Sequence, residues 1–198
     1  MEITRAIADD AGRLRVPELT PGAARILTVA SELFYRRGIH AIGVDTIAVE
    51  SGVTKRTLYD RFGSKDGLVT VYLQARHREW WDRLEERIAQ APSPRVLAVF
   101  DAYAGDPLPN DRGCAFLNAA GELPADHPAY GVVRAHKLAV RRRIDELLAE
   151  DHREPAAREQ LGEHLFLLLE GAIAHTGIDG DDALLRRVRT LAEHLLND

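Results

Sequence analysis

The chain has 198 residues, of which 45% are hydrophobic and 29% are charged, and its net charge is −5. This composition indicates a hydrophobic core in one compact domain or two small ones. No run reaches the roughly 18 apolar residues of a membrane span, and the first residues lack a signal-peptide core, so we expect a cytoplasmic protein without a membrane partner. The single cysteine, Cys114, excludes an intrachain disulfide and a multi-cysteine zinc site.

The charge is unevenly distributed. Residues 1 to 67 carry ten Lys and Arg against nine Asp and Glu, whereas residues 68 to 198 carry sixteen against twenty-two. Since DNA phosphates must be met by cations, a locally basic face near the N-terminus is compatible with a nucleic-acid partner despite the overall charge.

Residues 1 to 19 mix charges without apolar periodicity, which predicts a poorly ordered arm. Within it, Arg13 and Arg15 are either solvated or able to reach a minor groove. The first helix is predicted from residue 20 to about residue 37, because Thr20 is a good cap, Pro21 suits the first helical position and Gly38 ends the helix.

Residues 43 to 62 predict a helix-turn-helix. The apolar positions at helical spacing are Val44, Ile47 and Ala48 before the turn and Val53, Leu58 and Phe62 after it. Gly52 between them can adopt the left-handed conformation that reverses a chain. The outer face of the second short helix carries groups that suit phosphates and base edges, namely Lys55, Arg56, Thr57, Tyr59 and Arg61.

A long helix from residue 65 to about residue 89 follows, with Ser64 as its cap, and its length suits it to transmit movement along the molecule. Further helices are predicted at about 96–103, 113–123, 129–150, 155–176 and 181–196, between segments rich in proline, glycine and polar residues. The fold class is therefore all-α, with about nine helices.

The predicted helix at 155–176 is apolar on more than one face, so it must be covered on two sides, and the predicted helix at 181–196 carries a broad apolar stripe. The core of one chain can cover one face of each, and a second copy of the chain can cover the other. The candidate interface residues are Leu165, Leu169, Ile173, Leu184, Leu185, Val188, Leu191 and Leu195.

Two further features have two interpretations each. The run of Arg residues at 141–143 is either a DNA patch or, as we favour, a solvated face paired with nearby acids such as Asp145 and Glu146. Cys114 is either a redox-sensing thiol activated by Arg112 or a small buried residue in an apolar segment, and we favour the second.

No catalytic constellation is found in the sequence. None of the eight histidines has an acidic residue three positions before it, as a di-iron bundle requires. His-Glu-x-x-His, phosphate-loop and Gly-x-Ser-x-Gly motifs are also missing from the sequence. We therefore expect neither an enzyme nor a bound metal or other cofactor.

A series of short motifs lies in order between Leu33 and Lys65. They are Leu33-Phe34, Gly38, Asp45-Thr46-Ile47-Ala48, Ser51-Gly52-Val53-Thr54, Thr57-Leu58-Tyr59, Phe62 and Ser64-Lys65. In this order and spacing the chain resembles the TetR family of one-component transcriptional regulators, and the segment from Gly113 to Asn118 is similar to one found in many members. Gly43 departs from the Ser or Thr that many members place there, but glycine caps a helix nearly as well.

The resemblance implies a homodimer joined through the last two helices as a four-helix bundle. Its two reading helices would enter successive major grooves of a palindromic site in double-stranded DNA, roughly 34 Å apart. We assign base or near-base contacts to Lys55, Arg56 and Thr57. Phosphate contacts are assigned to Tyr59 and Lys65, and to Thr46 from the preceding helix.

The resemblance also implies an unknown small-molecule effector. An apolar pocket with a few polar anchors is the expected form of its site, although each aromatic residue is alternatively plain core. The candidate lining residues are Trp80, Trp81, Phe100, Tyr103, Phe116, Asn118, Tyr130, Phe166 and Glu170. Further polar candidates are Glu122, His136 and His175.

These features together predict an arm at 1–19, a DNA-binding domain at 20–66 with its motif at about 43–62, and an effector-binding and dimerisation domain at 67–198. The predicted function is that of a homodimeric repressor which a ligand releases from its operator, with activation in place of repression left open. The alternative is a ligand-binding or scaffolding helical dimer that has lost DNA binding.

Overall fold

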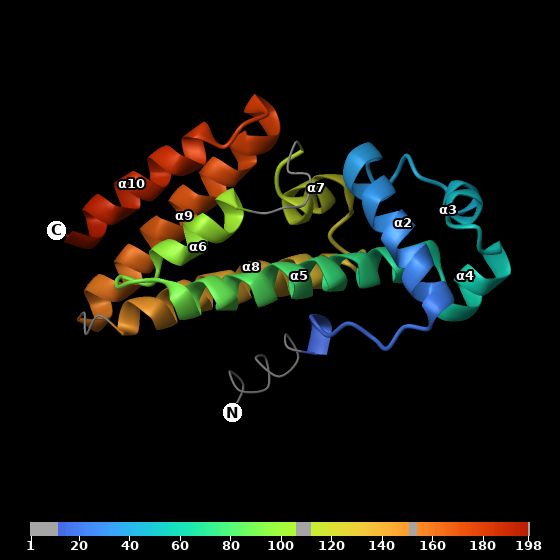
Figure 1. Ribbon diagram of the computed structural model, residues 1–198, viewed down its shortest axis with the longest axis horizontal. Helices are drawn as coiled ribbons and strands as arrows, with labels where there is room; N and C mark the ends of the chain where they lie inside the picture. The colour runs from blue at the N-terminus through green and yellow to red at the C-terminus, as the bar shows by residue number, and fades with distance from the viewer. Residues whose placement is uncertain (1–11, 106–111, 151–153, 198) are drawn as a thin grey trace. The chain divides into compact units, whose positions relative to one another are not determined.

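The computed structural model describes residues 12–105, 112–150 and 154–197, and every regular element in these ranges is an α-helix (Figure 1). The helices are α2 (Pro21–Arg37), α3 (Val44–Ser51), α4 (Lys55–Phe62), α5 (Lys65–Gln90), α6 (Leu97–Ala104), α7 (Ala115–Glu122), α8 (Tyr130–Ala149), α9 (Pro155–Asp179) and α10 (Ala183–Asn197). The all-α prediction is confirmed. The clearest difference is that α9 continues past the predicted end at residue 176 to Asp179.

No α-helix among the described residues combines the length and the apolar character needed to cross a membrane.

The described residues fall into two compact units. Unit 1 consists of the residues up to Arg78 together with Ala115–His136, and unit 2 consists of Glu79–Cys114 and the residues from Lys137 onward. The structure thus groups α7 and the first part of α5 with the N-terminal helices. The functional division at residue 66 stays a prediction.

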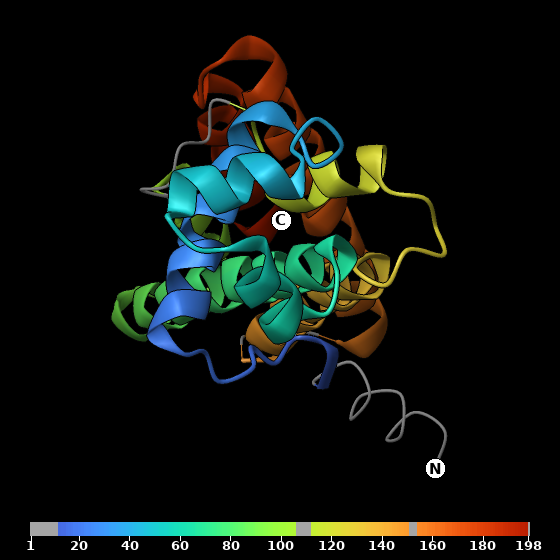
Figure 2. The ribbon, with the colours of Figure 1, turned by 90° about the vertical axis from the view of Figure 1, so that its right-hand side faces the viewer.

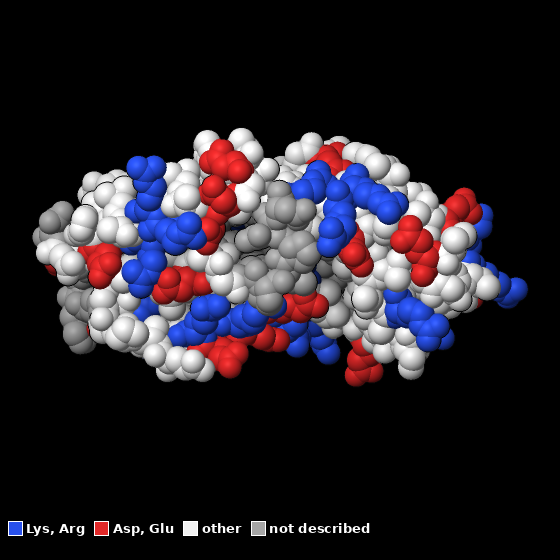
Figure 3. Space-filling model, turned by 45° about the horizontal axis from the view of Figure 1, so that its top comes forward, with Lys and Arg blue, Asp and Glu red and all other residues white. Residues whose placement is uncertain are grey.

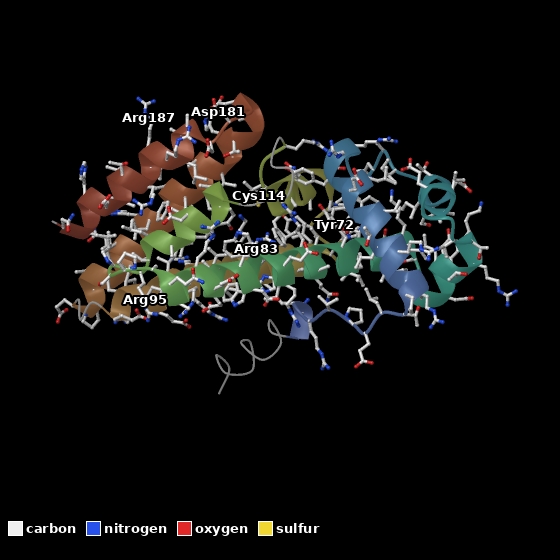
Figure 4. The ribbon with its side chains drawn as sticks, in the orientation of Figure 1. Tyr72, Arg83, Arg95, Cys114, Asp181 and Arg187 are labelled. Atoms are coloured by element: carbon white, nitrogen blue, oxygen red, sulfur yellow. The ribbon has the colours of Figure 1, made fainter. Side chains whose placement is uncertain are left out.

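Unit 1 is built around α2, which packs against α3 and α4. The predicted start of α2 is confirmed, because Thr20 Oγ1 accepts a hydrogen bond from Ala23 N at 3.4 Å and Pro21 occupies the first turn. Figure 2 views this unit from the side on which α3 and α4 lie. The Phe34 ring on α2 meets Tyr72 of α5 with their centroids 5.6 Å apart, and Figure 4 labels Tyr72.

The N-terminal arm is partly outside the described residues, because residues 1–11 are not described. At residue 13 the chain is attached to α5, since Gln74 Nε2 donates a hydrogen bond to the carbonyl oxygen of Arg13 at 2.8 Å. A minor-groove role for Arg13 and Arg15 stays a prediction.

Unit 2 is formed by α6, α9 and α10 together with the adjoining parts of α5 and α8, and α10 packs on both α9 and α6. Arg189 of α10 is joined to Asp101 of α6, with its Nε 2.6 Å from the Asp101 carboxylate. This ion pair fixes α10 to α6.

The favoured ion-paired interpretation of residues 141–143 is confirmed for two of the three arginines. Arg141 Nη2 lies 3.1 Å from Glu163 of α9, and Arg143 Nη2 lies 2.8 Å from Glu85 of α5. These partners belong to other helices, but Arg143 Nη1 also lies 3.1 Å from Glu146, one of the acids on the same helix that the sequence suggested. On the face shown in Figure 3, basic and acidic side chains are interspersed rather than separated by sign.

Candidate nucleic-acid interface

The turn between α3 and α4 has the predicted geometry. Gly52 is left-handed, with φ 64° and ψ 22°, and its N–H donates to the carbonyl oxygens at the end of α3. The next helix then starts at a cap, because Thr54 Oγ1 accepts a hydrogen bond from Thr57 N at 3.2 Å. The sequence-predicted helix-turn-helix is confirmed.

A single buried side chain anchors α4. Leu58 is fully buried and faces the core together with Ile47 of α3, while α2 packs against both short helices. Because a short helix with one buried leucine presents most of its surface outward, the other side chains of α4 are available for a partner.

Arg56, Tyr59 and Lys55 are the exposed residues among the predicted DNA contacts. The Arg56 side chain is 92% exposed, and its Nε lies 3.9 Å from the Asp60 carboxylate. Tyr59 is 48% exposed, which is unusual for an aromatic residue in a folded domain. Arg61 lies exposed at the end of the same helix.

Lys55 is exposed but bound to an acid on the preceding helix. Its Nζ lies 2.5 Å from Asp45 Oδ1. The hydrogen bond and the charge of Asp45 raise the pKa of Lys55. Since a phosphate and Asp45 would compete for the same ammonium group, this ion pair opposes the predicted DNA contact.

We expect Asp45→Asn to increase duplex affinity by about threefold at low salt, because it frees the Lys55 ammonium group for a phosphate and removes a negative charge beside the duplex. Fluorescence anisotropy with a labelled duplex would measure the dissociation constant at several salt concentrations. Glu32→Gln, at an exposed carboxylate of α2, controls for the general effect of removing one charge. Unchanged or weaker binding of the Asp45 variant would show that Lys55 does not contact DNA.

The other predicted contacts are less accessible. Thr57 is half-buried and its hydroxyl lies 3.0 Å from the Thr54 hydroxyl, so it belongs to the helix cap. Thr46 is half-buried on α3. Lys65, at the start of α5, is half-buried as well, and burial lowers its pKa against the opposing charges of Asp66 and Glu122.

The start of α5 is built tightly against the end of α4. Ser64 Oγ accepts a hydrogen bond from Gly67 N at 3.0 Å, which confirms the predicted cap. A Cβ atom at Gly67 would overlap the carbonyl oxygen of Phe62, the last residue of α4. Gly67 and Asp45 are both residues of the interface that sequence reasoning missed, because neither contact follows from helical spacing.

The nine candidate pocket residues are divided between the two units. Phe116, Asn118 and Tyr130 belong to unit 1, and the remaining six belong to unit 2. Phe116 stacks on His136 with ring centroids 3.7 Å apart, whereas Trp80 and Tyr103 pack together in unit 2 at 4.6 Å. These contacts are those of core residues, and the pocket assignment stays a prediction.

The polar candidates also have partners within the chain. Glu170 Oε2 lies 2.7 Å from Lys137 Nζ, which in turn lies 3.7 Å from the sulfur of Cys114, a half-buried residue labelled in Figure 4. The Glu122 carboxylate accepts a hydrogen bond from the backbone of His40 in unit 1, and its role in an effector pocket stays a prediction.

A surface pocket of about 530 Å³ lies in unit 2 between α8 and α9. It is lined by charged side chains of both signs, including Arg142, Arg158 and Glu159, and by none of the nine candidate residues. Among the described residues, no group of three or more His, Cys, Asp or Glu side chains is placed to hold a metal ion.

Comparison with known proteins identifies this architecture. Residues 26–71 match the family model described as bacterial regulatory proteins, tetR family. The structure is similar to that of SCO4454, a TetR-family transcriptional regulator from Streptomyces coelicolor, with a TM-score of 0.81 and 32% identity. That similarity covers 89% of this chain and 95% of SCO4454.

Two curated relatives match over shorter segments. The transcriptional activator FasR from Mycolicibacterium smegmatis is 49% identical over 50 residues, which are 25% of this chain and 23% of FasR. The transcriptional regulator MT1294 from Mycobacterium tuberculosis is 35% identical over 77 residues, or 38% of each protein. The chain thus covers less than two-fifths of each of these relatives.

The likeness to SCO4454 extends over nearly the whole of both chains, and the family model matches the helices that hold α4. The proteins of this family are transcriptional regulators and not enzymes. The chain therefore belongs to the TetR family of transcriptional regulators, and α3 and α4 are its DNA-binding helix-turn-helix.

Proposed function

We propose that the chain is a cytoplasmic, homodimeric repressor that binds a palindromic operator through α4 and leaves it when a small molecule binds. The observation that supports operator binding most strongly is the exposure of Arg56 and Tyr59 on a helix that Leu58 fixes in place. Arginine forms bidentate contacts with guanine, and a tyrosine hydroxyl contacts phosphate, so both groups match the assigned roles.

The direction of regulation is tested separately, because FasR is named an activator and matches this chain over 50 residues. A duplex selected by the full chain from a random library would be placed across the promoter of a reporter gene. Repression predicts a fall in reporter expression when the chain is produced. A rise would identify an activator.

The proposed dimer has to use side chains that remain exposed on one chain. Among the predicted interface residues, five are buried in the core of a single chain, namely Leu165, Leu169, Ile173, Leu185 and Val188. Leu184 and Leu195 are half-buried, and Leu191 is 44% exposed. Sequence reasoning missed Leu167 and Ile178 of α9, which are 61% and 73% exposed.

Leu167 and Ile178 lie on one face of α9, since eleven residues correspond to about three helical turns. Together with Leu191 on α10, which packs against α9, they leave apolar surface that a second copy would cover. The proposed interface therefore rests on these three residues rather than on the buried five.

We expect the double variant Leu167→Glu and Ile178→Glu to be monomeric, because four carboxylates would be buried in the symmetric interface. Size-exclusion chromatography with light scattering would show half the wild-type mass, with helical content unchanged by circular dichroism. Leu138→Glu on α8, where the leucine is 37% exposed, is the matched control. A wild-type monomer, or a dimeric double variant, would contradict this interface.

Release by a ligand requires that the ligand bind the DNA-incompetent state more tightly than the DNA-bound state. The proposed transmission runs along α5, which starts beside α4 and contributes to both units. A panel of apolar small molecules added to the complex of chain and selected duplex would test this step. Loss of the complex with one compound would identify the effector class, whereas no change with any compound would argue against ligand control by this class.

The alternative function, a helical scaffold without DNA binding, predicts a different salt response. A repressor must lose duplex affinity steeply as salt rises, because it releases counterions from the phosphates that it contacts. The exposure of Arg56 and Lys55 on α4 favours the repressor.

A further inference from the structure

Glu122, the last residue of α7, makes two contacts with the turn that leads from α2 into α3. Its Oε2 accepts a hydrogen bond from His40 N at 3.0 Å, and its carbonyl oxygen lies 2.5 Å from His40 Nε2. Both residues belong to unit 1, although 82 positions separate them in the sequence. The side chain and the backbone carbonyl group of Glu122 therefore both contact His40.

The turn is shaped to receive this carboxylate. Gly38 is buried with φ +89°, and Glu122 Oε2 lies 3.1 Å from the position that a Cβ atom of residue 38 would occupy. Any other residue at this position would combine a strained backbone with crowding of the Glu122 side chain. The negative charge of Glu122 also opposes the fall in the pKa of Lys65. The Glu122 carboxylate therefore lies within electrostatic range of the start of α5.

A second contact from the same segment reaches the other end of the helix-turn-helix. His127 Nε2 lies 3.3 Å from Asp66 Oδ1 in the first turn of α5. Ala129 N donates a hydrogen bond to His127 Nδ1 at 3.1 Å, so Nε2 carries the ring proton and donates it toward Asp66. Residues 122–127 thus contact the chain just before α3 and just after α4.

We propose that Glu122 is a positioning residue for DNA recognition, and that it links α7 to the placement of α3 and α4. This inference rests on the proposed operator binding. Glu122 acts through the Gly38–His40 turn and contacts no duplex itself. Without the Glu122 side chain, the Gly38–His40 turn has to be ordered when DNA binds. The conformational entropy lost in ordering the turn lowers the affinity for DNA.

The expected signature differs from that of a phosphate contact. Removing a residue that binds phosphate reduces the slope of log affinity against log salt by about one for each contact. Removing a positioning residue lowers affinity at every salt concentration and leaves the slope unchanged. A residue that merely stabilises the fold would lower the melting temperature without changing the affinity of the folded protein.

The experiment compares the full-length wild type with three variants on a duplex selected by the wild type from a random library. Glu122→Ala removes the acceptor, Glu122→Gln keeps one, and Glu32→Ala removes an exposed carboxylate of α2 as the matched control. We expect Glu122→Ala to weaken binding about tenfold with an unchanged salt slope. Glu122→Gln should stay within about threefold of the wild type, and Glu32→Ala should bind as the wild type does.

Hydrogen exchange tests the link to α7. Because coupling between two sites is reciprocal, duplex binding should slow amide exchange in residues 116–123 of the wild type, and this effect should be lost in Glu122→Ala. The proposal would be overturned if Glu122→Ala bound the duplex with wild-type affinity or with a changed salt slope. It would also be overturned if duplex binding left amide exchange in α7 of the wild type unchanged. If the wild type selects no duplex, operator binding itself fails and this inference fails with it.

Discussion

Replacing Arg56 and Tyr59 together with alanine is expected to weaken sequence-selective duplex binding by at least about 100-fold. Both side chains project from the exposed face of α4, where Arg56 Nε lies 3.9 Å from the Asp60 carboxylate, so their removal leaves Leu58 and the helix cap unchanged. A good bidentate base contact contributes about 1–3 kcal/mol of discrimination, and a symmetric dimer makes each contact twice. Binding to a non-specific duplex should change much less.

Competition between the selected duplex and a scrambled one would measure this loss of selectivity. Arg134→Ala is the matched control, because Arg134 is an exposed arginine of unit 1 that lies over the ring of Tyr130, with its guanidinium carbon 4.9 Å from the ring centroid. Tyr59→Phe separates the hydroxyl from the ring. If the double variant kept the wild-type preference for the selected duplex, α4 would not be the reading helix.

The second large effect is expected at Gly67. Gly67→Ala would drive a Cβ atom into the carbonyl oxygen of Phe62, so the end of α4 and the start of α5 must separate. Crowding of this kind typically costs about 1–3 kcal/mol of folding stability. We expect a lower melting temperature and, because α4 is displaced, duplex binding weakened by about tenfold or more.

Gly22→Ala is the matched control, because a Cβ atom at Gly22, in the first turn of α2, meets nothing within 4 Å. The same change there should raise stability by about 0.4–1 kcal/mol, since alanine reduces the freedom of the unfolded chain. Thermal unfolding followed by circular dichroism, together with duplex titration, would compare the two variants. Equal stability of both alanine variants would show that the junction between α4 and α5 is not tight.

The features that sequence reasoning predicted well are those that depend on near neighbours. Thr20 and Ser64 cap the helices that follow them, and Gly52 makes the left-handed turn. Each of these signals spans four residues or fewer, so backbone sterics and one hydrogen bond decide the outcome. The exposed face of α4 follows in the same way, from the spacing of its single buried leucine.

The features that it missed depend on contacts between distant segments. The sequence offers Glu122 only as a further polar candidate for an effector pocket, and its position against His40 follows from the packing of unit 1, which no local pattern encodes. In α9, apolar residues surround the helix, so spacing alone cannot say which of them the chain buries itself. The structure buries Leu165 and Leu169 and leaves Leu167 exposed between them.

Selection of duplex DNA from a random library by the purified full chain tests the central claim most directly, because the claim is that a dimer presents two copies of α4 to DNA. The account predicts enrichment of one sequence with two half-sites related by a two-fold axis, their centres about one helical turn apart. It also predicts that affinity for this sequence falls steeply with salt. Recovery of no preferred sequence, or of a single half-site bound by a monomer, would contradict the account.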